Sequence, residues 1–190
     1  MKLQSLLLLL TFQGVFSQTL LMNSTDKNTG TKTIITNNNR TGELTGDDTV
    51  VRNGLIFFSA GYQKIKTQGN PTEIYFIELN IVHKDNRLGC MKSEDGKVVL
   101  IFNDGTKVEC MQISEDDCDP IGFNSAFALM PKKGTQDIMK QNFEKLLTAD
   151  ITNIEIYTSE KKIIYNVKNT AKPIIKARFA LLDKTIKASL

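Results

Sequence analysis

The sequence predicts an α+β fold, in which a mainly antiparallel sheet carries an internal helix and a C-terminal helix packed on it. Short apolar and alternating runs, typical of strands, occupy much of residues 50–130. Helical spacing of apolar residues follows at 135–147 and again at 171–188, and strand-like runs at 151–158 and 163–167 lie between them. The order of strands, helix, strands and helix is typical of an α+β domain.

The first seventeen residues have the layout of a secretory signal peptide. Met1 and Lys2 give a positive start, the apolar run Leu3–Phe12 follows, and Val15–Ser17 precedes a cleavage site, so we expect the mature chain to begin at Gln18. The run is too short to cross a membrane, which takes about 20 apolar residues. The sequence therefore predicts an exported protein, periplasmic or extracellular, with no transmembrane segment in the mature chain.

Residues 18–49 form a polar N-terminal segment rich in Asn, Thr and Gly. Thr31–Thr36 has the character of a short strand, and a turn cluster follows at 37–42. A flexible extension and a polar hairpin remain as alternatives for this segment. We expect residues 50–190 to form a single α+β domain, because the length fits one domain with a small extension.

Strands are expected along the middle of the chain. Apolar runs predict strand structure at 55–58 and 61–65, and residues 72–83 alternate between apolar and polar positions. The residues on one face of this last strand are Tyr75, Ile77, Leu79, Ile81 and His83. A further strand is expected at 125–130, where Pro131 ends it.

The clearest local signal is a hairpin. Runs at 98–102 and 107–111 flank Asn103–Thr106, in which Asp104 and Gly105 suit the left-handed angles of a tight turn.

The internal helix is expected at 135–147. Thr135 is a suitable N-cap, and Asp137 lies favourably near the positive helix start. The residues of its apolar stripe are Ile138, Met139, Phe143, Leu146 and Leu147.

The C-terminal helix, expected at 171–188, has a basic character. Thr170 is a candidate cap, and Pro173 is tolerated in a first turn because its amide position has no partner within the helix. The apolar stripe is Ile175, Phe179, Leu182 and Ile186, and the basic residues are Lys172, Lys176, Arg178, Lys184 and Lys187. Such a helix can lie on an anionic membrane surface. We expect the commoner arrangement, in which the stripe packs on a sheet and the cations stay in water.

Several of these motifs follow one another in a recognisable order. The strand at 74–82 precedes Gly89-Cys90, the turn Phe102–Thr106 precedes Asp117-Cys118, and a helix then leads to Ile151–Tyr157. Over roughly residues 70–170 the chain resembles a set of uncharacterised small secreted or periplasmic bacterial domains. The resemblance implies an exported bacterial protein and carries no activity with it.

Three cysteines, Cys90, Cys110 and Cys118, occur in a chain that we expect to be exported, where disulfides persist. Three cysteines allow three single pairings. Cys110 shares a strand face with Val108 and is expected to point into the core, whereas the other two lie in turn-like surroundings. We therefore favour a Cys90–Cys118 disulfide with Cys110 as a buried thiol. A catalytic cysteine is disfavoured, because there is no Cys-x-x-Cys spacing and only one histidine to act as base.

Other candidate sites are weaker. The single histidine, His83, is more typical of a strand end than of a zinc site, since no second histidine completes a ligand set. The acidic residues Glu115–Asp117 and Asp119 offer oxygen ligands for Ca²⁺, but they lack the spacing of the known calcium loop, so a solvated turn is favoured.

Composition excludes some functions. A net charge of +3 is close to neutral and disfavours a nucleic-acid partner, and the absence of Trp disfavours binding by aromatic stacking. No nucleophile elbow, phosphate loop or His-Glu-x-x-His motif is present.

We therefore expect an exported, non-enzymatic binding or accessory module of the bacterial envelope, with no cofactor and with an envelope or secreted protein as candidate partner. One alternative is a small hydrolase that uses two carboxylates, for example Glu73 with Glu78 or Asp95 with Asp104. Another is an inhibitor or immunity-type protein.

Overall fold

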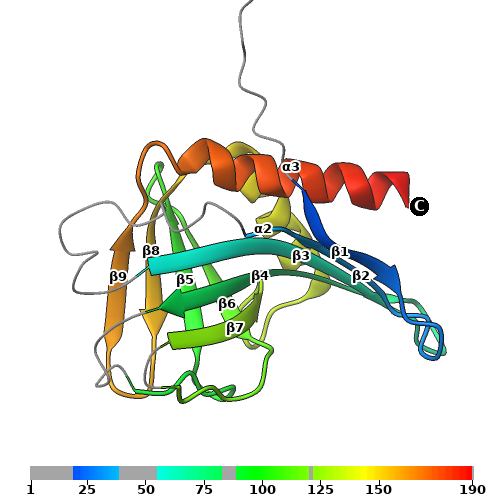
Figure 1. Cartoon of the computed structure of the whole chain (residues 1–190), viewed down its shortest axis with the longest axis horizontal. Coiled ribbons are helices and arrows are strands. Elements are labelled where there is room, and N and C mark those ends of the chain that lie inside the picture. Colours follow the sequence, from blue (N-terminus) through cyan, green and yellow to red (C-terminus); the bar gives the residue numbers. More distant parts are fainter. Residues whose placement is uncertain (1–18, 39–54, 83–88, 120–121, 190) are drawn as a thin grey trace, which may run out of the picture.

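The computed structural model describes residues 19–38, 55–82, 89–119 and 122–189. Within these ranges nine strands form one antiparallel sheet, and two helices lie against it (Figure 1). The strands follow the order β1-β2-β3-β4-β7-β6-β5-β8-β9 across the sheet. This confirms the predicted α+β class with an internal and a C-terminal helix. The predicted signal peptide at 1–17 and His83 lie outside the described residues.

Most elements lie close to their predicted positions, but β1 was not predicted and the runs expected at 55–58 and 61–65 form a single strand. The strand expected at 125–130 begins earlier and ends at Ala128. Their bounds are β1 (Leu20–Thr25), β2 (Lys32–Thr36), β3 (Leu55–Ile65), β4 (Thr72–Val82), β5 (Lys97–Phe102), β6 (Lys107–Gln112), β7 (Gly122–Ala128), α2 (Gln136–Thr148), β8 (Ile151–Tyr157), β9 (Lys162–Asn166) and α3 (Lys172–Ala188).

The described part of the polar N-terminal segment is a hairpin. Strand β1 pairs with β2, and β2 pairs in turn with β3, so the hairpin extends the same sheet. In the connecting turn the Asp26 carboxylate accepts hydrogen bonds from the amides of Asn28 and Thr29. Gly30 takes a φ of 67°, which favours glycine. Of the two alternatives, the structure therefore supports the hairpin.

The helices cover one face of the sheet, and the main core lies between the two layers. The predicted apolar face of β4 is confirmed, because Tyr75, Ile77, Leu79 and Ile81 are all buried. The Tyr75 ring contacts Phe143 of α2 with 4.5 Å between centroids, and Phe143 contacts Phe179 of α3 at 6.0 Å. Burying one such side chain stabilises the fold by about 1.5–3 kcal/mol.

Helix α2 has the predicted start, with one exception in its apolar stripe. The Thr135 hydroxyl accepts a hydrogen bond from the Ile138 amide, and Asp137 lies in the first turn. The Ile138 side chain, however, is 38% exposed. Its assignment to the apolar stripe was wrong, because the face that α2 presents to the sheet and α3 is the one carrying Met139, Phe143 and Leu146.

Helix α3 packs its apolar stripe into the core as expected, but two details differ. Thr170 is not its cap, because a turn closed by a hydrogen bond from the Ala171 amide to the Lys168 carbonyl places the N-cap at Ala171. Arg178 is 2% exposed rather than in water, since it lies one turn from both Ile175 and Leu182 on the buried side. Burial lowers the pKa of Arg178 to about 10. In the described ranges, neither helix has the length and apolar character needed to cross a membrane.

Candidate functional site

The cysteines pair as predicted. Cys90 and Cys118 form a disulfide, and Cys110 on β6 is a free, fully buried thiol. The disulfide joins the segment before β5 to the segment after β6, beside an isolated antiparallel pairing of Met91 with Asp117. Burial raises the pKa of the Cys110 thiol, so it stays protonated. All three cysteines therefore have structural positions.

Two of the acidic residues at 115–119 accept hydrogen bonds from backbone amides of neighbouring segments. The Asp116 carboxylate accepts a hydrogen bond from the Ser93 amide at 2.6 Å, and Asp117 accepts one from the Asn124 amide at 2.8 Å. Hydrogen bonds from the backbone and the side chain of Ser93 lower the pKa of Asp116. Across the four described ranges, no group of three or more His, Cys, Asp or Glu side chains is arranged to hold a metal ion.

The carboxylate pairs suggested from the sequence are not brought together. Glu73 and Glu78 lie on opposite faces of β4, because an odd separation along a strand reverses the side-chain direction. Asp95 precedes β5, whereas Asp104 follows it in the hairpin turn, so they lie at opposite ends of that strand.

A different cavity, of about 310 Å³, does gather carboxylates. It is lined by Ser93, Glu94, Asp95, Gly96, Lys97, Glu109, Met111 and Lys132. Lys97 pairs with Glu109 at 3.1 Å, and Lys132 donates to the Glu94 carbonyl at 3.1 Å. The lining thus has one more carboxylate than lysines, and the cavity has no surplus of positive charge.

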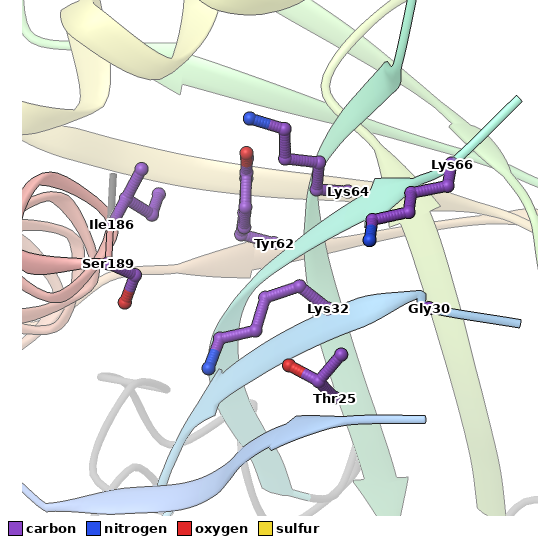
Figure 2. Close-up of a pocket in the computed structure, with 8 residues that line it drawn as sticks. All are labelled: Thr25, Gly30, Lys32, Tyr62, Lys64, Lys66, Ile186 and Ser189. Carbon is purple, nitrogen blue, oxygen red and sulfur yellow. The ribbon is translucent and has the colours of Figure 1, made fainter. Parts of the chain in front are cut away.

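A more distinctive site lies near the C-terminal end of α3, where strands β1, β2 and β3 end beside their connecting turns (Figures 1 and 2). This cavity, of about 280 Å³, is called the lysine pocket. Its lining residues are Thr25, Gly30, Lys32, Tyr62, Lys64, Lys66, Ile186 and Ser189.

The sheet register builds the pocket. Lys32 of β2 lies directly opposite Thr25 of β1 on one side and opposite Lys64 of β3 on the other. Lys64 in turn lies opposite Glu73 of β4. These four residues form one row across the sheet, on the same face as Tyr62, which is two residues from Lys64. The helix α3 reaches this face with Ile186, and the row lies at the edge of the covered area.

The charges in the row are not balanced. The Lys64 ammonium lies 3.6 Å from a Glu73 carboxylate oxygen, which also accepts a hydrogen bond from the Tyr62 hydroxyl at 2.8 Å. Burial, assisted by this bond to Glu73, raises the pKa of Tyr62, so the hydroxyl remains a donor. In the part of the chain that the structure describes, no acidic side chain forms an ion pair with Lys32 or Lys66. Glu73 therefore offsets one of three lysines.

The absence of a side chain at Gly30 leaves room for the side chain of Lys66. A Cβ at Gly30 would lie 2.9 Å from Cδ of Lys66, and the positive φ of Gly30 also disfavours other residues there. Figure 2 shows the three lysine side chains on one side of the pocket, and Ile186 of α3 with its C-cap residue Ser189 on the other. The ammonium nitrogens point in different directions, so a ligand would draw flexible side chains toward itself.

Sequence reasoning missed this pocket. The alternate spacing of Lys64 and Lys66 places both on one face of an extended segment, and this was the only local signal. Lys32 joins them through the pairing of β2 with β3, which the polar composition of residues 18–49 does not specify.

Comparison with known proteins leaves the family open. No protein-family model, curated protein or solved structure matches the chain. The chemistry of the pocket lining is therefore what bears on function. It offers ammonium and hydroxyl donors beside one apolar side chain, which suits the binding of an anion.

Proposed function

We propose that the protein is an exported, non-enzymatic binding module of the bacterial envelope, and that its lysine pocket holds an anionic group of the ligand. The observation that carries this proposal is the direct opposition of Lys32 and Lys64 on neighbouring strands, with Lys66 beside them. Like charges directly opposite one another destabilise a sheet. An anion that binds between them offsets this cost, so the arrangement is favourable when the pocket is occupied.

Export is supported by two features of the chain. The first seventeen residues have the composition of a signal peptide, and the Cys90–Cys118 disulfide is typical of oxidising compartments. The resemblance to small secreted or periplasmic bacterial domains adds to this support.

The lysine pocket is favoured over the cavity at Glu94 and Glu109 by its charge. The second cavity has three carboxylates against two lysines, one of which already pairs with Glu109, so its lining does not attract an anion. The two carboxylate pairs named as examples for the hydrolase alternative, Glu73 with Glu78 and Asp95 with Asp104, are separated in the fold and do not support it.

The proposal is tested by calorimetric titration of the mature chain, starting at Gln18, with a panel of small anions at constant ionic strength. The double variant Lys32→Gln/Lys66→Gln removes the two pocket lysines that form no ion pair with an acidic side chain of the described residues. Lys133→Gln/Lys140→Gln is the control, since it removes the same charge from exposed positions at and before α2.

We expect the pocket variant to bind at least about 10-fold more weakly, equal to about 1.4 kcal/mol, and the control to bind like the parent protein. Equal weakening in both variants would show that overall charge, rather than the pocket, attracts the anion. Turnover of a substrate that a single substitution abolishes would overturn the non-enzymatic part of the proposal.

A further inference from the structure

We infer that the group held in the lysine pocket is a phosphomonoester dianion and that Glu73 limits how tightly it binds. This inference rests on the proposed function and adds to it the chemical class of the ligand and the residue that sets the affinity.

The first argument is the charge of the pocket. Three ammonium groups line it, and Glu73 offsets the one on Lys64, which leaves a surplus of two positive charges. A phosphomonoester carries about −1.5 to −2 charges at pH 7. It therefore neutralises the surplus, whereas a single carboxylate would leave about one positive charge uncompensated.

The second argument is the choice of cation. All three are lysines, and in the pocket lining no arginine is present. Arginine presents a planar fork that binds carboxylate and phosphate alike, whereas lysine is a compact charge on a flexible stem with three donors and binds phosphate as a point charge. Because Lys32, Lys64 and Lys66 reach the pocket from separate positions (Figure 2), they can approach different oxygens of a tetrahedral group.

The third argument is size. Small-molecule sites in proteins usually measure about 300–1,000 Å³. The lysine pocket, at about 280 Å³, lies just below this range and has one apolar side chain, Ile186, in its wall. It therefore suits a phosphate attached to a short organic group rather than an extended polymer. Such a group occurs both in water-soluble phosphomonoesters and in lipid headgroups.

Glu73 competes with the ligand for the same donors. Its carboxylate pairs with Lys64 and accepts the Tyr62 hydroxyl, and it repels an incoming dianion. Glu73→Gln keeps an oxygen that accepts from Tyr62 but removes the charge. Glu73 is thus a positioning residue. Because Glu73→Gln keeps the hydrogen bond, a change in anion affinity in this variant reports the lost charge rather than a disrupted fold.

One opposing contribution comes from α3. The C-terminal end of a helix carries a partial negative charge, and Ser189 of the pocket is the C-cap residue of α3. The lysines would complement this helix end even without a ligand. Substituting the lysines distinguishes the two roles. If they only complement the helix end, the substitution lowers the stability of the protein, whereas if they bind a ligand, it also lowers the affinity for that ligand.

The experiment titrates the mature chain with inorganic phosphate, sn-glycerol 3-phosphate and acetate at pH 7.5 and constant ionic strength. We expect the two phosphates to bind at least about 10-fold more tightly than acetate. Glu73→Gln should tighten phosphate binding several-fold, Lys32→Gln/Lys66→Gln should abolish it, and Lys133→Gln/Lys140→Gln should leave it unchanged.

Sedimentation with lipid vesicles distinguishes a lipid headgroup from a water-soluble phosphomonoester. The vesicles are phosphatidylcholine with either phosphatidic acid, which is a phosphomonoester, or phosphatidylglycerol, which is a diester. Binding to phosphatidic acid that requires Lys32 and Lys66 assigns the lipid source, and binding of glycerol phosphate alone assigns the soluble one. Either supports the inference.

Two results would overturn it. If acetate binds as tightly as phosphate, the pocket is a general anion site. The inference of a phosphomonoester ligand then fails, and the proposed function stands. If no anion binds and the pocket variant only lowers the melting temperature, the lysines serve the end of α3, and both the inference and the proposed function fail.

Discussion

The ring of Phe76 on β4 lies over the α-carbon of Gly61, its cross-strand partner on β3. A Cβ at position 61 would lie 2.2 Å from Cζ of this ring, well inside contact distance. Phe76 is itself buried, on the opposite face of the strand from its neighbours Tyr75 and Ile77. The glycine thus makes room for an aromatic side chain that covers the backbone of β3.

We expect Gly61→Val to lower the free energy of unfolding by about 1–3 kcal/mol, because the added side chain must displace a packed ring. Urea denaturation measures this change. Gly69→Ala is the matched control, since nothing lies within 4 Å of a Cβ there, and a change within about 0.5 kcal/mol is expected. In a Phe76→Ala background the cost of Gly61→Val should shrink; an undiminished cost would show that the ring is not its cause.

The disulfide between Cys90 and Cys118 closes a loop with a sequence separation of 28 residues. Replacing both cysteines by serine is expected to lower the free energy of unfolding by about 2–4 kcal/mol, since the unfolded chain gains freedom. Denaturation of the two proteins with and without reductant measures the effect. Reductant should destabilise the parent protein and leave the double variant unchanged, and equal stability of the two oxidised proteins would contradict the prediction.

The buried Cys110 thiol predicts a dependence of stability on alkaline pH. Burial, and secondarily the charge of Glu109, raise the pKa of Cys110 above its ordinary value of 9.0. A group whose pKa is raised by folding contributes its full stability below the unfolded pKa and loses it as the pH rises toward the folded value. The free energy of unfolding should therefore decrease above about pH 9.

Urea denaturation between pH 8 and pH 11 tests this, with Cys110→Ala as comparison. The variant should show a shallower decrease, and part of the slope should remain because burial also raises the pKa of Tyr75 to about 12. An identical slope in both proteins would assign the whole effect to other groups.

The Gln112 side chain holds the loop that carries the disulfide. Its amide nitrogen donates to the carbonyls of Met91, at 3.2 Å, and Glu115, at 3.0 Å, and the side chain is buried. Gln112→Met keeps the approximate shape but removes both donors, so we expect a loss of about 1–3 kcal/mol. Hydrogen exchange should also accelerate at the amides of Met91 and Asp117, each of which donates to the carbonyl of the other residue.

Gln63→Met is the control for this prediction, because Gln63 is only partly buried and makes a single long hydrogen bond of 3.5 Å. A change within about 0.5 kcal/mol is expected there. If both substitutions cost the same, the two bonds of Gln112 do not hold the loop.

Features encoded by neighbouring residues were predictable. The turn at Asp104 and Gly105 forms as expected, with Gly105 at a φ of 78° and Asp104 accepting hydrogen bonds from Thr106. The Thr135 cap and the alternation along β4 were equally accurate. In each case the deciding interactions lie within a few residues along the chain, so the local pattern contains them.

The errors and omissions have the opposite origin. Arg178 lies on the apolar side of α3, and a charged residue by itself gives no signal that the fold buries it. Ile138 is apolar but lies just beyond the face that packs. The assignment of Thr170 as a cap failed because the preceding turn, not the residue type, sets where α3 begins.

The sequence by itself determined the α+β class and most of the strands and helices, because periodicity and turn chemistry are local properties of the chain. It favoured the Cys90–Cys118 pair, and the structure decided that pairing. Only the tertiary structure decided that β1 and β2 extend the sheet and that Lys32 lies opposite Lys64. The lysine pocket depends on that register. Pairing between strands that are distant in the chain follows from the burial of whole faces, which no short pattern of residues specifies.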